Sequence, residues 1–260
     1  MITRLLQVSD LHFGGRDELA GALDEVIARL TPDLVVATGD LTHRGRREQH
    51  QLAGTFLHDL GVPVIAVPGN HDIPYRLPAR FTSPWAEFER VWMTTEPVHA
   101  SEALHVVGLN SVRPWRHQSG GVSRAALARA ANRLAGAAPG ALRVVALHHQ
   151  FVNAPWRMRK RPLARRAHVL ATLADAGAEL FISGHVHQAT VSDRREFAVG
   201  VGGAVLSNAP GLARPRPDRL GEASGCVLYT ATENELTVDN WIRSDGWTLV
   251  GSRRYARAST

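Results

Sequence analysis

Five short blocks of aspartate, asparagine and histidine stand directly after apolar stretches of this 260-residue chain. The central block, residues 69–72, reads Gly-Asn-His-Asp and follows the apolar run 62–67. The other four blocks are Asp10-Leu11-His12, Gly39-Asp40, His148-His149 and Gly184-His185-Val186-His187. An apolar, β-branched run predicts a buried strand, and open α/β sheets bind ligands outside the carboxyl ends of their strands. The blocks therefore predict one polar site at the end of a sheet.

The residue types in the blocks indicate a pair of transition metal ions. Neutral imidazole is the commonest nitrogen ligand in proteins, and mixed nitrogen and oxygen ligands favour Mn, Fe, Zn or Co over Mg and Ca. Six or seven ligands are too many for one tetrahedral ion, but they suit two ions that share a bridging carboxylate, such as Asp40, and a bridging water. Two metals about 3.5–4 Å apart promote in-line displacement at phosphorus by a bridging hydroxide, and a nearby protonated histidine can donate to the leaving oxygen.

Alternating strand and helix patterns must position these blocks. Strands are expected at 5–9, 33–38, 62–67, 104–109, 143–147 and 179–183, and helices at about 17–30, 46–60, 123–134 and 163–176. The β-α-β-α-β order at the start predicts parallel strands joined by right-handed crossovers. Residues 73–101 contain four prolines and are expected to form an irregular insertion with one short helix at 85–93. We therefore expect a single α/β domain that spans residues 1–260.

The chain changes character after His187, where helical periodicity disappears. Short alternating segments occur near 197–201, 226–229, 235–242 and 247–250. Such alternation predicts strands with one buried face. We expect residues 188–260 to supply mostly antiparallel strands of a second sheet.

Charge and cysteine content limit the class of protein. The formal net charge of +6 favours anionic partners, which include phosphorylated small molecules, nucleic acid and acidic lipid. A single cysteine, Cys226, excludes a disulfide within the chain and fits a reducing compartment. No apolar stretch approaches the 18 or so residues that a membrane span needs, and the first residues lack the features of a signal peptide. A cytoplasmic protein is the expectation.

The five blocks, in this order over residues 10–187, resemble the signature of the calcineurin-like metallophosphoesterases. The subgroup with the strongest resemblance consists of small bacterial enzymes similar to class III cyclic-nucleotide phosphodiesterases. The resemblance implies an α/β (α+β) fold of four layers, in which two packed mixed β-sheets are flanked by helices. It also implies a metal-dependent phosphoric ester hydrolase with a dinuclear centre of Mn, Fe or Zn.

The resemblance assigns each block residue a role. Seven residues are implied as metal ligands: Asp10, His12, Asp40, Asn70, His148, His185 and His187. One ion would be bound by Asp10, His12 and His187, and the other by Asn70, His148 and His185. Asp40 would bridge the two ions.

The remaining implied roles concern the substrate. Asn70 and His71 would contact the phosphate, and His71 would act as the general acid, with Asp72 orienting its imidazole. The sequence departs from many relatives in one place, because Gln150 rather than proline follows the paired histidines. The metal ligand of that pair is still expected to be His148, with His149 beside the site.

The sequence leaves several functions open. The leading hypothesis is a dimetal phosphodiesterase for a small phosphodiester, with a cyclic nucleotide as one candidate. The same type of site serves phosphomonoesterases and pyrophosphate hydrolases. A nuclease is less favoured, because the basic residues are scattered or confined to one loop, and a non-catalytic scaffold is disfavoured because every ligand is present.

Other questions also stay open at this point. The sequence does not decide whether His43 lines the site, whether the basic run 156–166 contacts phosphate, or whether the protein is a monomer or a homodimer. The expected partner is a small-molecule phosphodiester. Loops 73–101, 151–166 and 208–225 are expected to set its identity.

Overall fold

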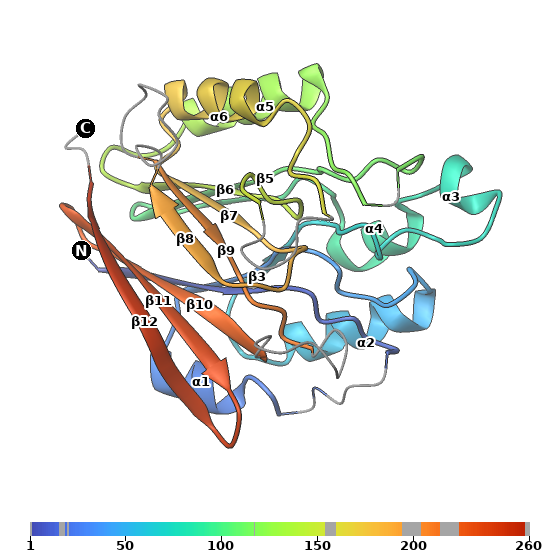
Figure 1. The fold of residues 1–260 in the computed structure, drawn as a ribbon, viewed down its shortest axis with the longest axis horizontal. Helices are drawn as coiled ribbons and strands as arrows, with labels where there is room; N and C mark the ends of the chain where they lie inside the picture. The colour runs from blue at the N-terminus through green and yellow to red at the C-terminus, as the bar shows by residue number, and fades with distance from the viewer. Residues whose placement is uncertain are drawn as a thin grey trace.

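Two six-stranded mixed sheets lie at the centre of the computed structural model, with helices on both outer faces (Figure 1). The structure describes residues 2–15, 19, 21–116, 118–153, 160–193, 204–213 and 224–257. Apolar residues from both sheets, among them Leu5, Val36, Val144 and Tyr229, form one buried cluster between them. The expected four-layer α/β architecture is confirmed.

The first sheet has the order β12-β11-β10-β1-β2-β3. Its parallel part consists of β1 (Thr3–Val8), β2 (Leu34–Ala37) and β3 (Val64–Ala66). Its antiparallel part consists of β10 (Ser224–Ala231), β11 (Glu235–Arg243) and β12 (Trp247–Ala256). The parallel pairing predicted for the first three strands is confirmed.

The second sheet has the order β4-β5-β6-β7-β9-β8. Its four inner strands are parallel: β5 (Leu104–Gly108), β6 (Leu142–Ala146), β7 (Leu180–Ser183) and β9 (Val205–Asn208). Its edges are antiparallel and are formed by β4 (Val98–Ala100) and β8 (Thr190–Asp193).

The strands after His187 are mostly antiparallel, as expected, but they do not all belong to the second sheet. Strands β8 and β9 extend the sheet that contains β7, whereas β10, β11 and β12 extend the sheet that contains β1. Alternation of apolar residues tells which face of a strand is buried, but not which strand lies beside it. Here Tyr229 of β10 is opposite Leu5 of β1 and buries its ring between the sheets. The strand expected at 197–201 lies outside the described residues.

Helices cover the two outer faces, as Figure 1 shows. The first sheet is covered by α1 (Asp24–Leu30) and α2 (Arg47–His58), and the second by α5 (Arg124–Ala135) and α6 (Arg166–Asp175). The expected N-cap of α5 is confirmed, because the Ser123 hydroxyl accepts a hydrogen bond from the Ala126 amide. Among the helices that the structure describes, none has the length and apolar character needed to span a lipid bilayer.

The segment 73–101 is more ordered than the sequence predicts. It contains α3 (Ala79–Thr82), α4 (Ala86–Trp92), which matches the predicted helix, and strand β4. Phe88 of α4 is fully buried in the cluster beneath the first sheet, against α2. The end of this segment therefore belongs to the main core, while its beginning borders the polar site.

Candidate metal centre

The polar blocks follow strands β1, β2, β3, β6 and β7, and the backbone joins them to one another. The amide of Asp10 donates to the Gly39 carbonyl at 2.9 Å, and the amide of Gly184 donates to the His148 carbonyl at 3.0 Å. A bond between the sheets completes the arrangement, because the His185 amide donates to Asp10 Oδ2 at 3.0 Å. The His71 amide, which donates to Asp40 Oδ1, adds the block after β3, so the expected convergence of all five blocks is present.

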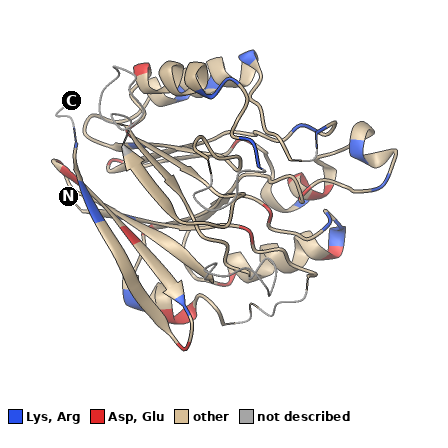
Figure 2. Ribbon diagram, in the orientation of Figure 1, with Lys and Arg blue, Asp and Glu red and all other residues tan. Residues whose placement is uncertain are grey.

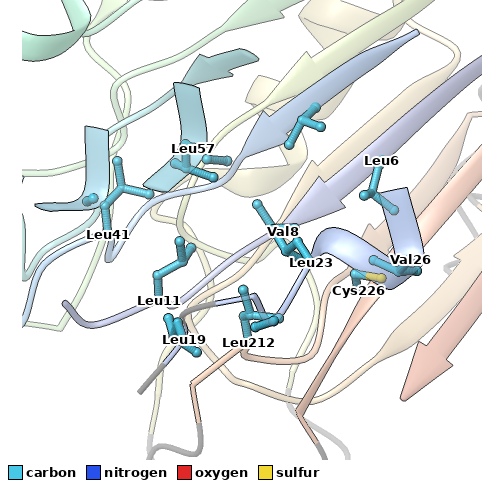
Figure 3. Close-up of a cluster of buried hydrophobic side chains, with 14 of the residues drawn as sticks. Leu6, Val8, Leu11, Leu19, Leu23, Val26, Leu41, Leu57, Leu212 and Cys226 are labelled. Atoms are coloured by element: carbon cyan, nitrogen blue, oxygen red, sulfur yellow. The ribbon is translucent and has the colours of Figure 1, made fainter. Parts of the chain in front are cut away.

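Apolar neighbours anchor the ligands to the core. Leu11 lies between Asp10 and His12, and Leu41 follows Asp40 (Figure 3). Both leucines are buried in the cluster formed with α1 and α2. Packing of these side chains fixes the backbone on either side of the polar residues.

Five candidate ligands have left-handed backbone conformations. Their φ angles lie between 50° and 71°, and they are Asp10, His12, Asp40, His185 and His187. Only three other non-glycine residues in the described part of the chain share this feature. Because such a conformation costs energy for a residue with a Cβ atom, it persists where the surrounding structure enforces it, typically at functional sites.

Two glycines permit the close approach of neighbouring blocks. A Cβ atom on Gly69 would lie 2.2 Å from Asp40 Oδ1, and one on Gly184 would lie 1.8 Å from the Ser9 hydroxyl oxygen. Neither space can hold a methyl group. Glycine at these positions therefore lets two pairs of ligand blocks touch, 69–72 with 39–40 and 184–187 with 10–12.

The first ligand group consists of Asp10, His12 and His187, whose candidate ligand atoms lie within 4.8 Å of one another. Asp10 Oδ1 is 3.0 Å from His187 Nε2 and 4.0 Å from His12 Nε2. The rings of His12 and His187 are stacked, with centroids 5.3 Å apart. The other carboxylate oxygen of Asp10 accepts from the Ser9 hydroxyl at 2.6 Å, which leaves Oδ1 for an ion.

The second ligand group consists of Asp40, His148 and His185, with Asn70 beside them. His148 Nε2 is 3.0 Å from His185 Nδ1, 3.2 Å from Asn70 Oδ1 and 3.4 Å from Asp40 Oδ2. Asp40, His148 and His185 are almost completely inaccessible to solvent. This group is thus deeper than the first, in which His12 is partly exposed.

Backbone carbonyls select the ligand nitrogen of two histidines. His148 Nδ1 donates to the Thr38 carbonyl at 2.9 Å, and His185 Nε2 donates to the Gln118 carbonyl at 3.2 Å. A carbonyl only accepts, so each bond places the proton on that nitrogen and leaves the other nitrogen with a lone pair. Metal-binding histidines are commonly oriented in this way.

The second ligand group places several hydrogen-bond acceptors against one another, and a cation between them would relieve their repulsion. The lone pairs of His148 Nε2 and His185 Nδ1 face each other, with Asn70 Oδ1 and the Asp40 carboxylate close by. Acceptors at such distances repel one another unless a proton or a metal ion lies between them. In the first group Asp10 Oδ1 and His187 Nδ1 have no hydrogen-bond partner among the described residues. Both groups therefore fit the metal ions expected from the sequence.

The pKa values of Asp10 and His148 also indicate that positive charge is favoured in the site. Burial opposes ionisation of Asp10, but His187 and His148 hold the pKa of Asp10 well below its usual range. Burial alone would lower the pKa of His148, but the Asp40 carboxylate outweighs it and raises that pKa to about 9. A proton on His148 then compensates the carboxylates at the place where a metal ion fits.

His71 lies beside both groups and partly faces solvent. Its amide donates to Asp40 Oδ1 at 2.8 Å. Its ring Nδ1 donates to the His43 carbonyl at 2.8 Å, and the Tyr75 hydroxyl is 3.2 Å from the same nitrogen. The carbonyl places the proton on Nδ1, so Nε2 is the nitrogen that can exchange a proton with a substrate.

Asp72, which was expected to orient the imidazole of His71, has other partners in the structure. Asp72 accepts from the amides of Gly69, Leu41 and Thr42 at 2.8, 3.2 and 2.8 Å, and from the Thr42 hydroxyl at 2.9 Å. These four donors occupy both carboxylate oxygens. Asp72 therefore ties the block after β3 to the block after β2, and the His43 carbonyl orients the imidazole.

The structure also shows where the residues lie whose role the sequence did not decide. The His43 side chain borders the site, with its ring centroid 6.0 Å from that of His71. His149 is buried next to His185, and its Nδ1 lies 2.8 Å from the Ser111 hydroxyl oxygen. Of the basic run 156–166, residues 156–159 lie outside the described residues, and Lys160 donates to the His185 carbonyl.

Sequence reasoning missed the residues that orient the histidines of the site. Thr38 and Gln118 orient His148 and His185, and His43 orients His71, all through backbone carbonyls, which carry no side-chain signal. Tyr75 was a findable exception, since it follows His71 by four residues and carries a polar group at the tip of an aromatic ring.

Comparisons with known proteins agree with this geometry. Residues 3–189 match the family model of the calcineurin-like phosphoesterases. A glycerophosphodiester phosphodiesterase, GpdQ, of Enterobacter lignolyticus is 36% identical over 80 residues, which cover 26% of this chain and 29% of the relative. A probable cyclic nucleotide phosphodiesterase of Synechococcus is 28% identical over 127 residues, covering 45% of this chain and 47% of the relative. The matches thus span less than half the length of these curated relatives.

The fold has counterparts among solved structures. A dimetal phosphatase of Danio rerio superposes with a TM-score of 0.65 at 15% identity, covering 98% of this chain and 99% of that one. This likeness concerns the arrangement of sheets and helices.

Proposed function

Since the chain belongs to the calcineurin-like phosphoesterase family, we propose that it is a dimetal phosphodiesterase that hydrolyses a small phosphodiester. The observation that carries the proposal is the pair of buried ligand groups, each with one carboxylate, beside His71. The groups meet where the carboxyl ends of strands from both sheets converge. Such a position is where α/β folds bind their ligands.

The seven candidate ligands would hold the two ions. Asp10, His12 and His187 would hold one, and Asn70, His148 and His185 the other. Asp40 is the candidate bridge, because its Oδ2 faces His148 while its Oδ1 is fixed by the His71 amide. When bound, the ions would activate water and offset charge on the phosphoryl oxygens.

His71 is the candidate proton donor to the leaving oxygen. Its Nδ1–H is held by the His43 carbonyl, so the ring can protonate and release a proton only at Nε2. A fixed ring orientation keeps this nitrogen at one place relative to the phosphate. Proton transfer of this kind typically contributes about 10²–10⁴-fold to the rate.

A small substrate fits the distribution of charge better than a nucleic acid does. Figure 2 shows Lys and Arg spread over α1, α2, α5, α6 and β12 of the described chain. A nucleic-acid-binding face would gather them in one basic stripe. The relatives named for phosphodiester substrates support a diester, and cyclic nucleotides are candidates among them.

The test compares two substrates on the Mn²⁺-loaded protein. An aryl phosphodiester and the corresponding monoester are supplied to the wild type and to the Asn70→Ala and His71→Ala variants. We expect the diester to be hydrolysed much faster than the monoester, and Asn70→Ala to lose about a hundredfold or more in kcat. His71→Ala is expected to lose about a hundredfold or more with an alkyl diester, whose leaving oxygen needs a proton, and less with the aryl diester. Faster hydrolysis of the monoester would instead assign the protein as a phosphomonoesterase. Undiminished activity in both variants would refute the proposed site.

Metal content separates the site from the substrate. The wild type is expected to hold two ions, and His71→Ala is expected to keep both, because His71 is not among the proposed ligands. If two ions are bound but neither ester is cleaved, cyclic nucleotides and glycerophosphodiesters are the next substrates to compare.

A further inference from the structure

Three imidazoles meet at the accessible side of the centre. His12, His43 and His71 each offer a ring nitrogen, and these atoms lie within 4.8 Å of one another. The ring centroids are 4.9 Å apart for His12 and His71, and 6.0 Å apart for His43 and His71. All three side chains are partly exposed, unlike the members of the second ligand group. An ion can therefore reach them from solvent.

The backbone leaves these nitrogens available. The hydrogen bond from His71 Nδ1–H is accepted by the backbone carbonyl of His43, not by its side chain. The imidazole of His43 is thus not needed to orient His71, and Nε2 of His71 keeps a lone pair. The main chain of His43 orients His71, and its ring nitrogen remains available to an ion.

The donor set differs from those of the two buried groups. Each buried group contains a carboxylate, Asp10 or Asp40, whereas the exposed group contains three imidazoles and no carboxylate. Ions at the high-affinity end of the divalent series, such as Zn²⁺ and Cu²⁺, accept imidazole readily, while Mn²⁺ relies more on oxygen ligands. Three protein ligands and one open position are also a common arrangement for Zn²⁺.

We propose that His12, His43 and His71 form a third, inhibitory cation site that takes Zn²⁺ or a similar nitrogen-preferring ion. An ion at this site occupies Nε2 of His71, which then cannot pass a proton to the leaving group. This inhibitory role rests on the proposed function of His71, while the existence of the site does not. The site also shares His12 with the first ligand group, so once that group is filled a third ion is held mainly by His43 and His71.

The surrounding charges make this site the weakest of the three. Arg44 and Arg46 act on His43 and repel a cation, while Asp40 attracts one. Asp40 is itself neutralised once the buried groups are loaded. Zinc is therefore expected to occupy the exposed site last, and inhibition is expected only at zinc concentrations above those that fill the two buried groups.

The test titrates Zn²⁺ into the Mn²⁺-loaded wild type and into His43→Ala. Bound zinc is counted by elemental analysis after equilibrium dialysis, and hydrolysis of an alkyl diester, whose leaving oxygen needs a proton, is followed in parallel. We expect the wild type to bind one more zinc ion than the variant. We also expect the variant to need at least about tenfold more zinc for half inhibition, because losing even an outer partner of a metal ligand costs 10–100-fold in affinity.

Two further variants serve as controls. His168→Ala removes an exposed imidazole from α6 and is expected to behave like the wild type. His43→Asn replaces the ring with an amide and repeats the test if the alanine variant folds poorly. Both substitutions at position 43 keep the carbonyl that orients His71, so each variant is compared with its own rate before zinc is added.

Each outcome decides a separate point. Equal zinc binding in wild type and His43→Ala overturns the third site, and an additional ion without inhibition overturns its inhibitory role. Inhibition that is identical in both proteins places zinc in the buried groups. If the Mn²⁺-loaded wild type hydrolyses no ester, the proposed function fails, and zinc counting still decides whether the site exists.

Discussion

The buried centre and its rim are built in different ways. In the centre, Asp10, Asp40 and His148 are inaccessible to solvent, and each is held by groups from another block. On the rim, Tyr75 and Trp115 are largely exposed, at 44% and 68%. The centre is thus fixed by bonds between strands of both sheets, whereas the rim projects from a loop.

Arg80 connects the two loops that carry Tyr75 and Trp115. Arg80 is buried, and its Nε donates to the Pro114 carbonyl at 2.7 Å while Nη1 donates to the Pro74 carbonyl at 3.2 Å. Its guanidinium also lies 5.9 Å from the ring centroid of Tyr75. This difference teaches that the side chains of the rim and the candidate metal ligands are held in place by separate sets of bonds.

The largest expected effect comes from Asp40→Asn in the centre. The substitution keeps an oxygen that can accept from the His71 amide but removes the charge that faces His148. We expect bound metal to fall from two ions to one or none, and kcat/KM to fall by about 10³-fold or more, since metal stabilisation is worth several kcal/mol. Elemental analysis and initial rates measure both. A variant that kept two ions and normal rates would show that Asp40 does not bridge.

Metal removal is expected to have the next largest effect. Without ions, the facing acceptors of His148, His185 and Asp40 lose their compensating charge. Metal at a hundred times its dissociation constant stabilises a protein by about 2.7 kcal/mol, so chelation is expected to lower Tm by several degrees. Calorimetry measures the shift with and without Mn²⁺. The rim variant Trp115→Ala is expected to show the same shift as the wild type, and a smaller shift would tie the rim to the ligands.

Asp72→Asn tests how the centre is held together. The new amide group would oppose either the donors from Gly69 and Leu41 or those from Thr42. Leaving buried groups unsatisfied costs about 1–3 kcal/mol, and urea denaturation is expected to show this loss with an unchanged m-value. If Asp72 instead oriented the imidazole directly, a loss of kcat without a loss of stability would be observed.

The centre was predictable from sequence because its signals are side chains at strand ends. Asp10, Asn70 and His185 each follow an apolar run, and the structure brings all five blocks together. The parallel pairing of β1, β2 and β3 followed from the alternation of strands and helices. These signals are local, so a pattern along the chain is enough to detect them.

The rest depends on pairings that local patterns do not encode. The alternating pattern of β10 marks a strand but does not name β1 as its neighbour. The role of Asp72 was misjudged because a carboxylate beside a histidine gives no sign that backbone amides will surround it. The third histidine group was not predicted, although the sequence left open whether His43 lines the site, because His43 meets His12 only through the parallel pairing of β1 and β2.

The smallest expected effect, from Tyr75→Phe, measures where the centre ends. The lost hydroxyl lies 3.2 Å from His71 Nδ1, which keeps its shorter bond to the His43 carbonyl. A neutral hydrogen bond contributes about 0.5–1.5 kcal/mol, and partial exposure favours the lower end, so kcat is expected to fall about two- to threefold. The fall should appear with alkyl diesters, whose leaving oxygen needs a proton, and should be smaller with 4-nitrophenyl esters. A hundredfold loss would instead make Tyr75 part of the centre, and the separation between centre and rim would have to be redrawn through this hydroxyl.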